Sequence, residues 1–262
     1  MTLDVTRDEH GVLTLRLDRT EKRNAVDDDM MRALVEAFDA AATDDHVRVI
    51  VLEGAGEHFC GGADIVARNQ GAGRPRAGSI QRRLPTQAHR LIPQICAIQV
   101  PVVAKVRGWA AGIGFQLALA ADFTIAAADA RFWQPFAERG FTPDSGATWL
   151  LPRRVGDVRA RELLLLGRAL SGEEADAWGL IHRAVVPEGL DAAVDEIVRR
   201  LATGPTVALG LTKWLLHAGA GISLEEHLAN EAFAMELSAR TEDFREGLTA
   251  FAEKRAPRFE GR

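Results

Sequence analysis

Two glycine-rich stretches of this chain have the composition of sites that bind a negatively charged oxygen. Gly61 and Gly62 precede Ala63 in the first stretch, and Gly112 precedes Ile113 in the second. Glycine lets the backbone approach a ligand closely, and N–H groups at the start of a helix have no acceptor within that helix. One N–H group from each stretch would together form an oxyanion hole for a carbonyl that gains negative charge. Each stretch alone is also explained by the need for a tight turn.

A dinucleotide-binding loop is a different explanation for the second stretch. That loop needs a third glycine three residues after the second, in the pattern G-x-G-x-x-G. Leu117 stands at this position after Gly112 and Gly114, and no glycine-rich turn follows the first predicted strand. We therefore exclude a dinucleotide-binding fold.

A single acid, Asp144, stands in the apolar segment GFTPDSGATWLLPRRVG at residues 140–156. Five aromatic residues close in the sequence would keep bulk water away from its carboxylate: Phe132, Trp133, Phe136, Phe141 and Trp149. A carboxylate in such a position can act as a general base. It can also cap the helix predicted to begin near Ser145, which is a common role for aspartate. The two roles are compatible.

The apolar residues around these stretches recur with the spacing of strands and helices. In residues 27–42 they recur every three or four positions, which predicts a helix, and the acids at 27–29 suit its positively charged start. Strands are predicted at Val12–Leu17, Val47–Leu52 and Pro101–Val106, and helices at Asp27–Ala42, near Gln81–Ile98 and from Gln116 onward. This alternation of strands, glycine turns and helices predicts an α/β core.

The last quarter of the chain changes character and is nearly all helical in its pattern. Helices are predicted at Asp191–Leu201, Pro205–His217, Leu224–Ala239 and Glu242–Lys254. We therefore expect a separate helical layer after the α/β core.

The composition is that of a soluble globular protein, with 47% apolar residues, 26% charged residues and a net charge of -5. No apolar run approaches the length of a membrane span, and the first residues lack the pattern of a secretory signal. The negative charge gives no reason to expect a nucleic acid partner. The two cysteines, Cys60 and Cys96, have no metal-ligand spacing, and we expect them to be reduced thiols of a cytoplasmic protein.

Several segments in order resemble the crotonase superfamily, which includes enoyl-CoA hydratases and isomerases. They are FCGGADI (59–65), GWAAGIGFQLALAADFTIA (108–126), residues 152–156, residues 169–186 and the tail TEDFREGLTAFAEKRAPRF (241–259). The resemblance implies a spiral of ββα turns over residues 1–195 and a helical trimerisation region over residues 196–262. It also implies homotrimers or hexamers, an acyl-CoA thioester as substrate, no metal, and no cofactor apart from the coenzyme A of that substrate.

The resemblance assigns the two oxyanion donors to the backbone N–H groups of Ala63 and Ile113. Many family members have glycine at the second position, and Ile113 departs from that pattern. The departure is tolerable if φ of Ile113 is negative, because only the N–H group is used.

The acidic residues decide which reaction the resemblance implies. Family hydratases have two glutamates that orient a water molecule, and the matching positions here are Gln116 and Phe136, which are not carboxylates. Asp144 instead resembles the single aspartate of the epoxyphenylacetyl-CoA isomerase type, which moves a proton. The chlorobenzoyl-CoA dehalogenase type uses an aspartate with similar spacing as a nucleophile, but has a supporting Trp where this chain has Phe136.

The resemblance also implies binding residues for both ends of the substrate. Coenzyme A would be held by Lys22, Arg23, Ala25, Ala63, Asp64, Ile65, Phe251 and Lys254, the last two commonly from a neighbouring subunit. The acyl group would lie among Trp133, Phe136, Phe141 and Trp149. The arginine-rich stretch at residues 71–83 would form an edge of this acyl pocket and assist phosphate binding, and Asp64 would stabilise its own loop.

Three functions remain open from the sequence. The first is an isomerase that shifts a double bond, or opens an epoxide ring, by means of Asp144. The second is a hydratase, or another lyase or hydrolase, that uses Gln116 and Glu138 as secondary groups, although Glu138 is more simply a solvated charge. The third is an acyl-CoA-binding protein with little catalytic activity.

Overall fold

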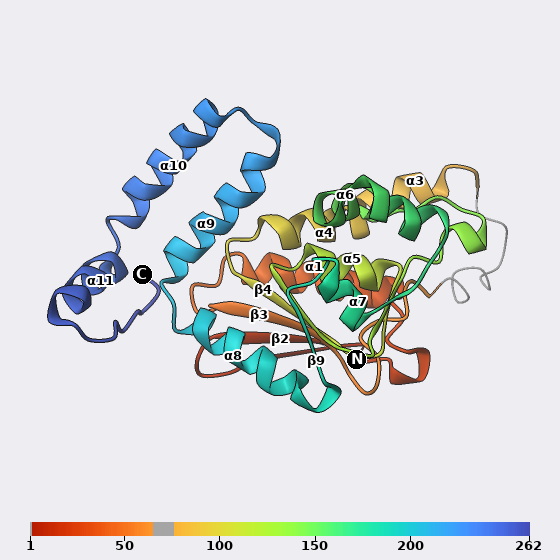
Figure 1. Cartoon of the computed structure of the whole chain (residues 1–262), viewed down its shortest axis with the longest axis horizontal. Helices are drawn as coiled ribbons and strands as arrows, with labels where there is room; N and C mark the ends of the chain where they lie inside the picture. Colours follow the sequence, from red (N-terminus) through yellow and green to blue (C-terminus); the bar gives the residue numbers. More distant parts are fainter. Residues whose placement is uncertain (1, 65–75) are drawn as a thin grey trace.

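A computed structural model describes residues 2–64 and 76–262 of the chain (Figure 1). Within those residues, six strands form a central sheet in the order β1-β2-β3-β4-β6-β9. They are β1 (Leu3–Arg7), β2 (Val12–Leu17), β3 (Val49–Gly54), β4 (Val102–Val106), β6 (Phe123–Ala127) and β9 (Arg183–Val185). β1 and β2 are antiparallel, whereas the other neighbouring pairs are parallel. Parallel neighbours need long crossover connections, so the predicted α/β class is confirmed.

Helices lie on both faces of the sheet (Figure 1). One face carries α1 (Asp28–Ala41), α4 (Ala88–Ala97) and α5 (Ile113–Ala120), and the other carries α8 (Leu190–Ala202). Helix α1 begins as the sequence predicts, because the Asp27 side chain accepts a hydrogen bond from the N–H group of Met30 at 2.8 Å. Its apolar stripe, which includes Leu34 and Phe38, is fully buried.

A smaller sheet brings the two glycine loops together. It consists of β5 (Trp109–Ala111), β7 (Arg131–Trp133) and β8 (Leu170–Ser171). Beside it, Cys60 pairs with β5: its N–H group donates to Trp109 at 2.8 Å, and its carbonyl accepts from Ala111 at 2.9 Å. Since β5 leads directly into the second glycine loop, this pairing sets that loop against the first.

Two predicted elements differ from the structure. The strand predicted at residues 47–52 is β3, which begins two residues later because residues 44–47 form a turn closed by the Val47 N–H group. The helix predicted near residues 81–98 is broken into α3 (Ser79–Arg83), a short 3-10 turn (Leu84–Thr86) and α4. Gln87 interrupts it with non-helical backbone angles, φ -126° and ψ -113°, while its side chain donates to Asp28 at 3.1 Å.

The C-terminal helices extend away from the sheet (Figure 1). Helices α9 (Thr206–Ala218) and α10 (Leu224–Ser238) form a hairpin, followed by α11 (Glu242–Glu253). The expected boundary at residue 195 falls inside α8, which packs on the sheet with core residues as late as Ala202. The change in architecture therefore comes between α8 and α9. None of the helices in the described ranges is both long and apolar enough to cross a bilayer.

Candidate active site

A cavity of about 630 Å³ lies between the two glycine loops, α3 and the chain that follows β7. Its lining includes five residues that the sequence predicted for the site: Ala63, Ile113, Phe136, Phe141 and Asp144. They come from well-separated parts of the chain, so the fold assembles the predicted centre of the site.

The two glycine loops touch each other at this cavity. Gly62 has a φ of +105° and Gly112 has a φ of +50°, a region that favours glycine. A Cβ atom on Gly62 would lie 3.3 Å from the Ala111 carbonyl oxygen, and one on Gly112 would lie 3.8 Å from the Cα of Gly62. Each loop therefore needs its glycine for its backbone angles, and the first also needs it for close contact with the second.

The residue after each of these glycines presents a backbone N–H group. Val26 bonds with the residues on either side of Ala63, donating to Gly62 at 2.8 Å and accepting from Asp64 at 2.9 Å. The N–H group of Ala63 therefore points away from Val26. Ile113 is the first residue of α5, so its N–H group has no acceptor in the helix. Across residues 2–64 and 76–262, neither N–H group has a hydrogen-bond acceptor.

Ile113 fits its position without backbone strain. The non-glycine residues with positive φ in the described ranges are Arg23, Asn24, Ser145 and Lys254. The condition that the sequence set for an isoleucine at this donor position is therefore met. The next residue, Gly114, is the one that must be small, because a Cβ atom there would lie 2.5 Å from the Cβ of Cys60. Burial raises the pKa of the Cys60 thiol to about 12, so this side chain stays neutral under the loops.

Asp144 is half-buried on the cavity wall, and its side chain does not cap a helix. Helix α6 (Ala147–Leu165) begins after Gly146, which gives it no side-chain cap. The Asp144 carboxylate instead accepts a hydrogen bond from the Ser145 hydroxyl at 3.0 Å. Ser145 is 3% exposed and has a φ of +54°, which costs a non-glycine residue about 1–2 kcal/mol. The capping alternative is therefore not supported, and the strained turn places a buried donor on the acid.

A pair of buried glutamines lies behind Asp144. The Gln116 amide donates to the Gln134 side chain at 3.3 Å and to the Asp144 backbone carbonyl at 3.4 Å. The other amide atoms, Gln116 Oε1 and Gln134 Nε2, are buried and have no partner in the described part of the chain. The hydrogen-bond partner of Gln116 is thus Gln134. It is not Phe136, which stands where family hydratases have their second glutamate.

The predicted aromatic pocket is only partly assembled. Phe136 and Phe141 meet edge to face at 5.4 Å between ring centroids and line the cavity. Contrary to the sequence prediction, the described lining does not include Trp133 or Trp149. The Trp133 indole donates to the carbonyl of Gly167 at 2.9 Å, and Trp149 is 43% exposed beneath the guanidinium of Arg153. Both tryptophans point elsewhere because backbone and cationic partners hold them.

The two other acids that the sequence considered lie outside this cavity lining. Glu138 is exposed and lies beside Gly167, which agrees with a solvated charge. Asp64 is 7% exposed and pairs with Arg19 at 3.0 Å. Arg19 also donates to the carbonyl of Ala25 at 2.6 Å, so Asp64 helps to join the first glycine loop to the segment before α1.

Comparison with known proteins places the chain in a family. Residues 7–262 match the family model described as enoyl-CoA hydratase/isomerase. The chain belongs to the enoyl-CoA hydratase/isomerase family. A 1,2-epoxyphenylacetyl-CoA isomerase of Escherichia coli is 39% identical over 254 residues, which cover 97% of each chain. A protein named probable enoyl-CoA hydratase from Rhodobacter capsulatus is also 39% identical, over 96% of this chain and 95% of that protein.

Solved structures agree with this assignment to the enoyl-CoA hydratase/isomerase family. An enoyl-CoA hydratase from Bacillus anthracis superposes with a TM-score of 0.93 at 30% identity, covering 100% of both chains. The resemblance to the crotonase superfamily and its fold, inferred from the glycine loops and the tail, is therefore confirmed. Relatives with isomerase and hydratase names are equally similar, so similarity alone does not choose the reaction.

The residues predicted to hold coenzyme A lie in two distant places. Arg23 adjoins the first glycine loop, where its carbonyl accepts from the Gly61 N–H group at 2.7 Å. Lys22 beside it is exposed, whereas Ala25 is half-buried. Figure 1 places α11, which carries the 86% exposed Phe251 and is followed directly by Lys254, far from α3 at the cavity. Ile65, predicted for the same group, lies outside the described residues.

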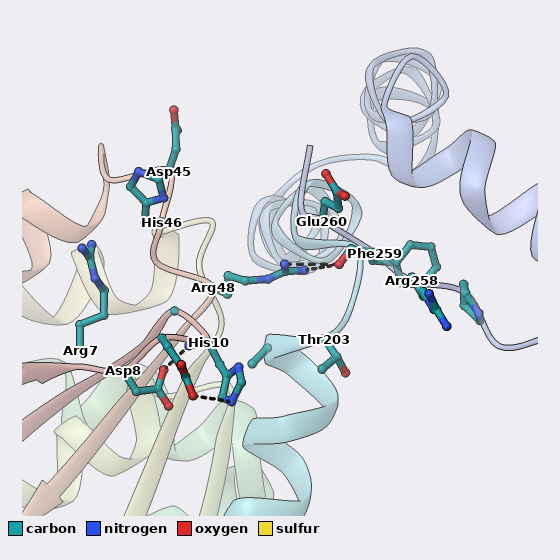
Figure 2. Close-up of a pocket in the computed structure, with 14 residues that line it drawn as sticks. Arg7, Asp8, His10, Asp45, His46, Arg48, Thr203, Arg258, Phe259 and Glu260 are labelled. Atoms are coloured by element: carbon teal, nitrogen blue, oxygen red, sulfur yellow. Dashed lines mark hydrogen bonds and ion pairs between the residues drawn. The ribbon is translucent and has the colours of Figure 1, made fainter.

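A second and larger cavity, of about 760 Å³, lies where the C-terminal tail meets the edge of the sheet (Figure 2). It contains neither glycine loop nor Asp144. Arg48 reaches across it to the carbonyls of Gly204, at 2.6 Å, and Phe259, at 3.4 Å. The Arg48 guanidinium is thus engaged by backbone carbonyls of the chain itself, and at this cavity it holds the C-terminal tail against the edge of the sheet.

Sequence reasoning missed two residues near Asp144. Ser145 lines the cavity and donates to the Asp144 carboxylate, and Gln134 accepts a hydrogen bond from Gln116, which also donates to the Asp144 carbonyl. Ser145 carried a weak signal, because Ser-Gly after Asp is typical of a turn. Gln134 carried none of its own, because its partner comes from a distant segment. Arg76 and Arg83 line the cavity where the sequence placed the arginine-rich stretch 71–83, of which residues 71–75 lie outside the described residues.

Proposed function

We propose that the chain is an acyl-CoA isomerase in which Asp144 moves a proton between two carbons of the acyl group. The observation that carries this proposal is that Asp144 shares one cavity with the free N–H groups of Ala63 and Ile113, while Gln116 and Phe136 occupy the positions of the hydratase glutamates. The lining of the cavity in the described ranges includes no other carboxylate.

In this proposal the thioester oxygen lies between the two N–H groups. The Asp144 carboxylate removes a proton from C2 of a 3-enoyl-CoA, and the electrons of the broken C–H bond delocalise to the thioester oxygen as a dienolate. The aspartic acid then returns the proton to C4, and the double bond lies between C2 and C3. In a substrate with an epoxide carbon bonded to C2, loss of the C2 proton to Asp144 would likewise give an enolate; its electrons would form a double bond from C2 to that carbon as the C–O bond breaks, and the aspartic acid would return the proton to the released oxygen. Coenzyme A takes part only as a portion of the substrate, and these steps use only the chain's own residues.

The proposal includes self-association as a homotrimer or hexamer. Helices α9, α10 and α11 together form a helical arm. Support comes from large apolar side chains that this arm exposes, among them Leu216 at 77%, Phe233 at 61% and Phe251 at 86%. A neighbouring arm would also bring Phe251 and Lys254 to a cavity that their own chain holds at a distance. Size-exclusion chromatography with light scattering tests this part, and a monomer at micromolar concentration would contradict it.

Hydration is the second candidate. It is favoured by Gln116 Oε1 and Gln134 Nε2, which have no partner in residues 2–64 and 76–262, since an acceptor and a donor on hydrogen-bonded side chains could hold a water molecule near Asp144. The relative in Rhodobacter capsulatus carries a hydratase name as well.

The test compares the wild-type protein with Asp144→Asn on 3-enoyl-CoA, 2-enoyl-CoA and 1,2-epoxyphenylacetyl-CoA. We expect isomerisation by the wild type and a loss of about 10²- to 10⁴-fold in the variant, the usual contribution of a general base. Asp157→Asn is the matched control, because Asp157 is 73% exposed on α6. Hydration that survives in Asp144→Asn would instead support the second candidate, and binding of coenzyme A without turnover would reduce the protein to a binding function.

A further inference from the structure

The turn that carries Asp144 contains a residue type that its backbone does not favour. The turn spans residues 144–147 and is closed by the Ala147 N–H group, which donates to the Asp144 carbonyl at 3.1 Å. Its two central residues, Ser145 and Gly146, have φ values of +54° and +83°. Turns with positive φ at both central positions are dominated by glycine, asparagine and aspartate. Backbone preference therefore does not explain the serine.

The other non-glycine residues with positive φ in the described ranges have ordinary explanations. Arg23 and Lys254 each directly follow a helix, and this conformation lets their N–H groups bond back to its last turn. Asn24 belongs to a residue type that tolerates positive φ. Ser145 has neither explanation, because it precedes the helix α6 and is not an asparagine.

The side chain of Ser145 provides the missing reason. It is 3% exposed, and its hydroxyl donates to Asp144 Oδ1 at 3.0 Å. Within residues 2–64 and 76–262, no other group donates a hydrogen bond to that carboxylate. The Asp144 backbone is held separately, because its carbonyl accepts from Ala147 and, at 3.4 Å, from the Gln116 amide. The hydroxyl is thus the donor that fixes how the carboxylate turns about its side-chain bonds.

This contact makes the two oxygens of the Asp144 carboxylate different. Oδ1 is engaged by the hydroxyl, whereas Oδ2 has no donor in the described part of the chain. When the C2–H bond breaks, an O–H bond forms on the free oxygen, and when that O–H bond breaks, the C4–H bond forms. An aspartic acid keeps one oxygen without a proton, so Oδ1 can accept from Ser145 before, between and after the two steps. The donor therefore needs no rearrangement during the reaction.

We propose that Ser145 is a positioning residue, whose hydroxyl holds Asp144 Oδ1 so that Oδ2 carries the proton between C2 and C4. The inference rests on the proposed isomerase function and names the group that orients its base. Glycine would suit the turn better and would lack the hydroxyl, which explains why a strained serine is present at the edge of the cavity.

Two substitutions separate the hydroxyl from the turn. Ser145→Gly removes the hydroxyl and relieves the backbone, whereas Ser145→Ala removes the hydroxyl and keeps the strain, so thermal melting should show the glycine variant to be the more stable. With a 3-enoyl-CoA as substrate, we expect kcat to fall by about 10- to 100-fold in both variants, the range of a hydrogen bond to a charged group. KM should stay unchanged, because the hydroxyl contacts the base and not the acyl group.

A deuterium label at C2 of the substrate reports the orientation of the acid. In both variants the freed carboxylic acid can turn and exchange with water, so a smaller fraction of the label should reach C4 than in the wild type. Ser145→Cys keeps a weak donor of similar size and should retain part of kcat. Ser238→Ala on the helical arm is the matched control, because its hydroxyl donates to the Met235 carbonyl at 3.1 Å, and kcat should not change.

The outcomes distinguish a positioning role from a structural one. A residue that only formed the turn could be replaced by glycine without loss. Wild-type kcat and label transfer in Ser145→Gly, alongside an inactive Asp144→Asn, would therefore overturn this inference and leave the proposed function intact. A wild-type protein that does not isomerise the 3-enoyl-CoA would overturn the proposed function, and the inference with it.

Discussion

The cavity and the base of the helical arm differ in whether their shielded polar groups have hydrogen-bond partners within the chain. At the cavity, the N–H groups of Ala63 and Ile113 and the Nε atom of Arg83 have no partner in the described ranges. At the base of the arm, Lys213 on α9 is 7% exposed and fully engaged. It donates to the carbonyls of Ile95 at 2.9 Å and Val100 at 3.2 Å, and pairs with Asp122 at 2.7 Å.

This difference distinguishes polar groups that are available to a ligand from polar groups that stabilise the fold. A buried polar group without a partner costs free energy in the folded protein, so such groups are retained where a ligand completes them. Lys213, with every donor engaged, instead joins α9 to α4 and to the residues just before β4. Polar side chains in the cavity should therefore affect catalysis more than folding, and those at the base of the arm should do the reverse.

The first prediction concerns Lys213→Met, which removes one charge of a buried pair. Burial raises the pKa of Asp122, and burial lowers that of Lys213, so each charged form depends on its partner. We expect the free energy of unfolding to fall by about 3–5 kcal/mol in urea denaturation, because the largely shielded Asp122 carboxylate loses its cationic partner and keeps the Val102 N–H group as a donor. Activity per folded molecule should stay unchanged.

The double variant Asp122→Asn, Lys213→Met controls for that lone charge. It should regain part of the lost stability, since no unpaired ion remains. A double variant that is less stable than Lys213→Met would show that the pair does not act as proposed.

The second prediction moves to the cavity, where Gly112→Ala should displace an oxyanion donor. Alanine does not tolerate φ +50° with ψ -123°, so the N–H group of Ile113 would turn from its position. We expect kcat to fall by about 10²- to 10³-fold, the usual effect of losing one donor. Gly221→Ala is the matched control, because a Cβ there meets nothing within 4 Å and its φ is ordinary. An unchanged kcat in Gly112→Ala would remove Ile113 from the site.

The third and smallest effect is predicted for Gln116→Glu. The amide of Gln116 donates to two acceptors, Gln134 Oε1 and the Asp144 carbonyl, and an ionised glutamate would face both with a bare oxygen. We expect a loss of about tenfold in kcat at pH 8, which shrinks toward pH 5 as the new acid takes up a proton and can donate again. Gln99→Glu, at an exposed position, is the control. A gain in hydration by Gln116→Glu would favour the hydratase candidate.

The sequence predicted those parts of the site that depend on local backbone chemistry. The glycine stretches pointed to the donors because glycine before a helix start has a direct physical meaning, and Asp144 stood out as an acid in an apolar segment. Helix α1 followed from its apolar spacing. These features need only neighbours in the chain, and the structure assembles them in one cavity.

Contacts between distant segments were beyond the sequence. Trp149 is close to Asp144 in the chain, yet it turns toward Arg153 and away from the cavity. Gln134 gains its significance only when the fold sets it against Gln116, 18 residues earlier. The helix predicted near residues 81–98 breaks before Gln87, and Pro85 in the turn ahead of it is a local signal that the apolar spacing does not contain. For Trp149 and Gln134 a tertiary contact decides the orientation, and periodicity does not carry that information.

The most direct test of the account follows the proton itself. A 3-enoyl-CoA labelled with deuterium at C2 is converted in ordinary water under single-turnover conditions, and the label at C4 of the 2-enoyl product is measured by mass spectrometry. If Asp144 carries the proton from one carbon to the other, part of the deuterium appears at C4, and Asp144→Asn forms no such product. A product whose added C4 hydrogen comes entirely from water would contradict a single-carboxylate shuttle.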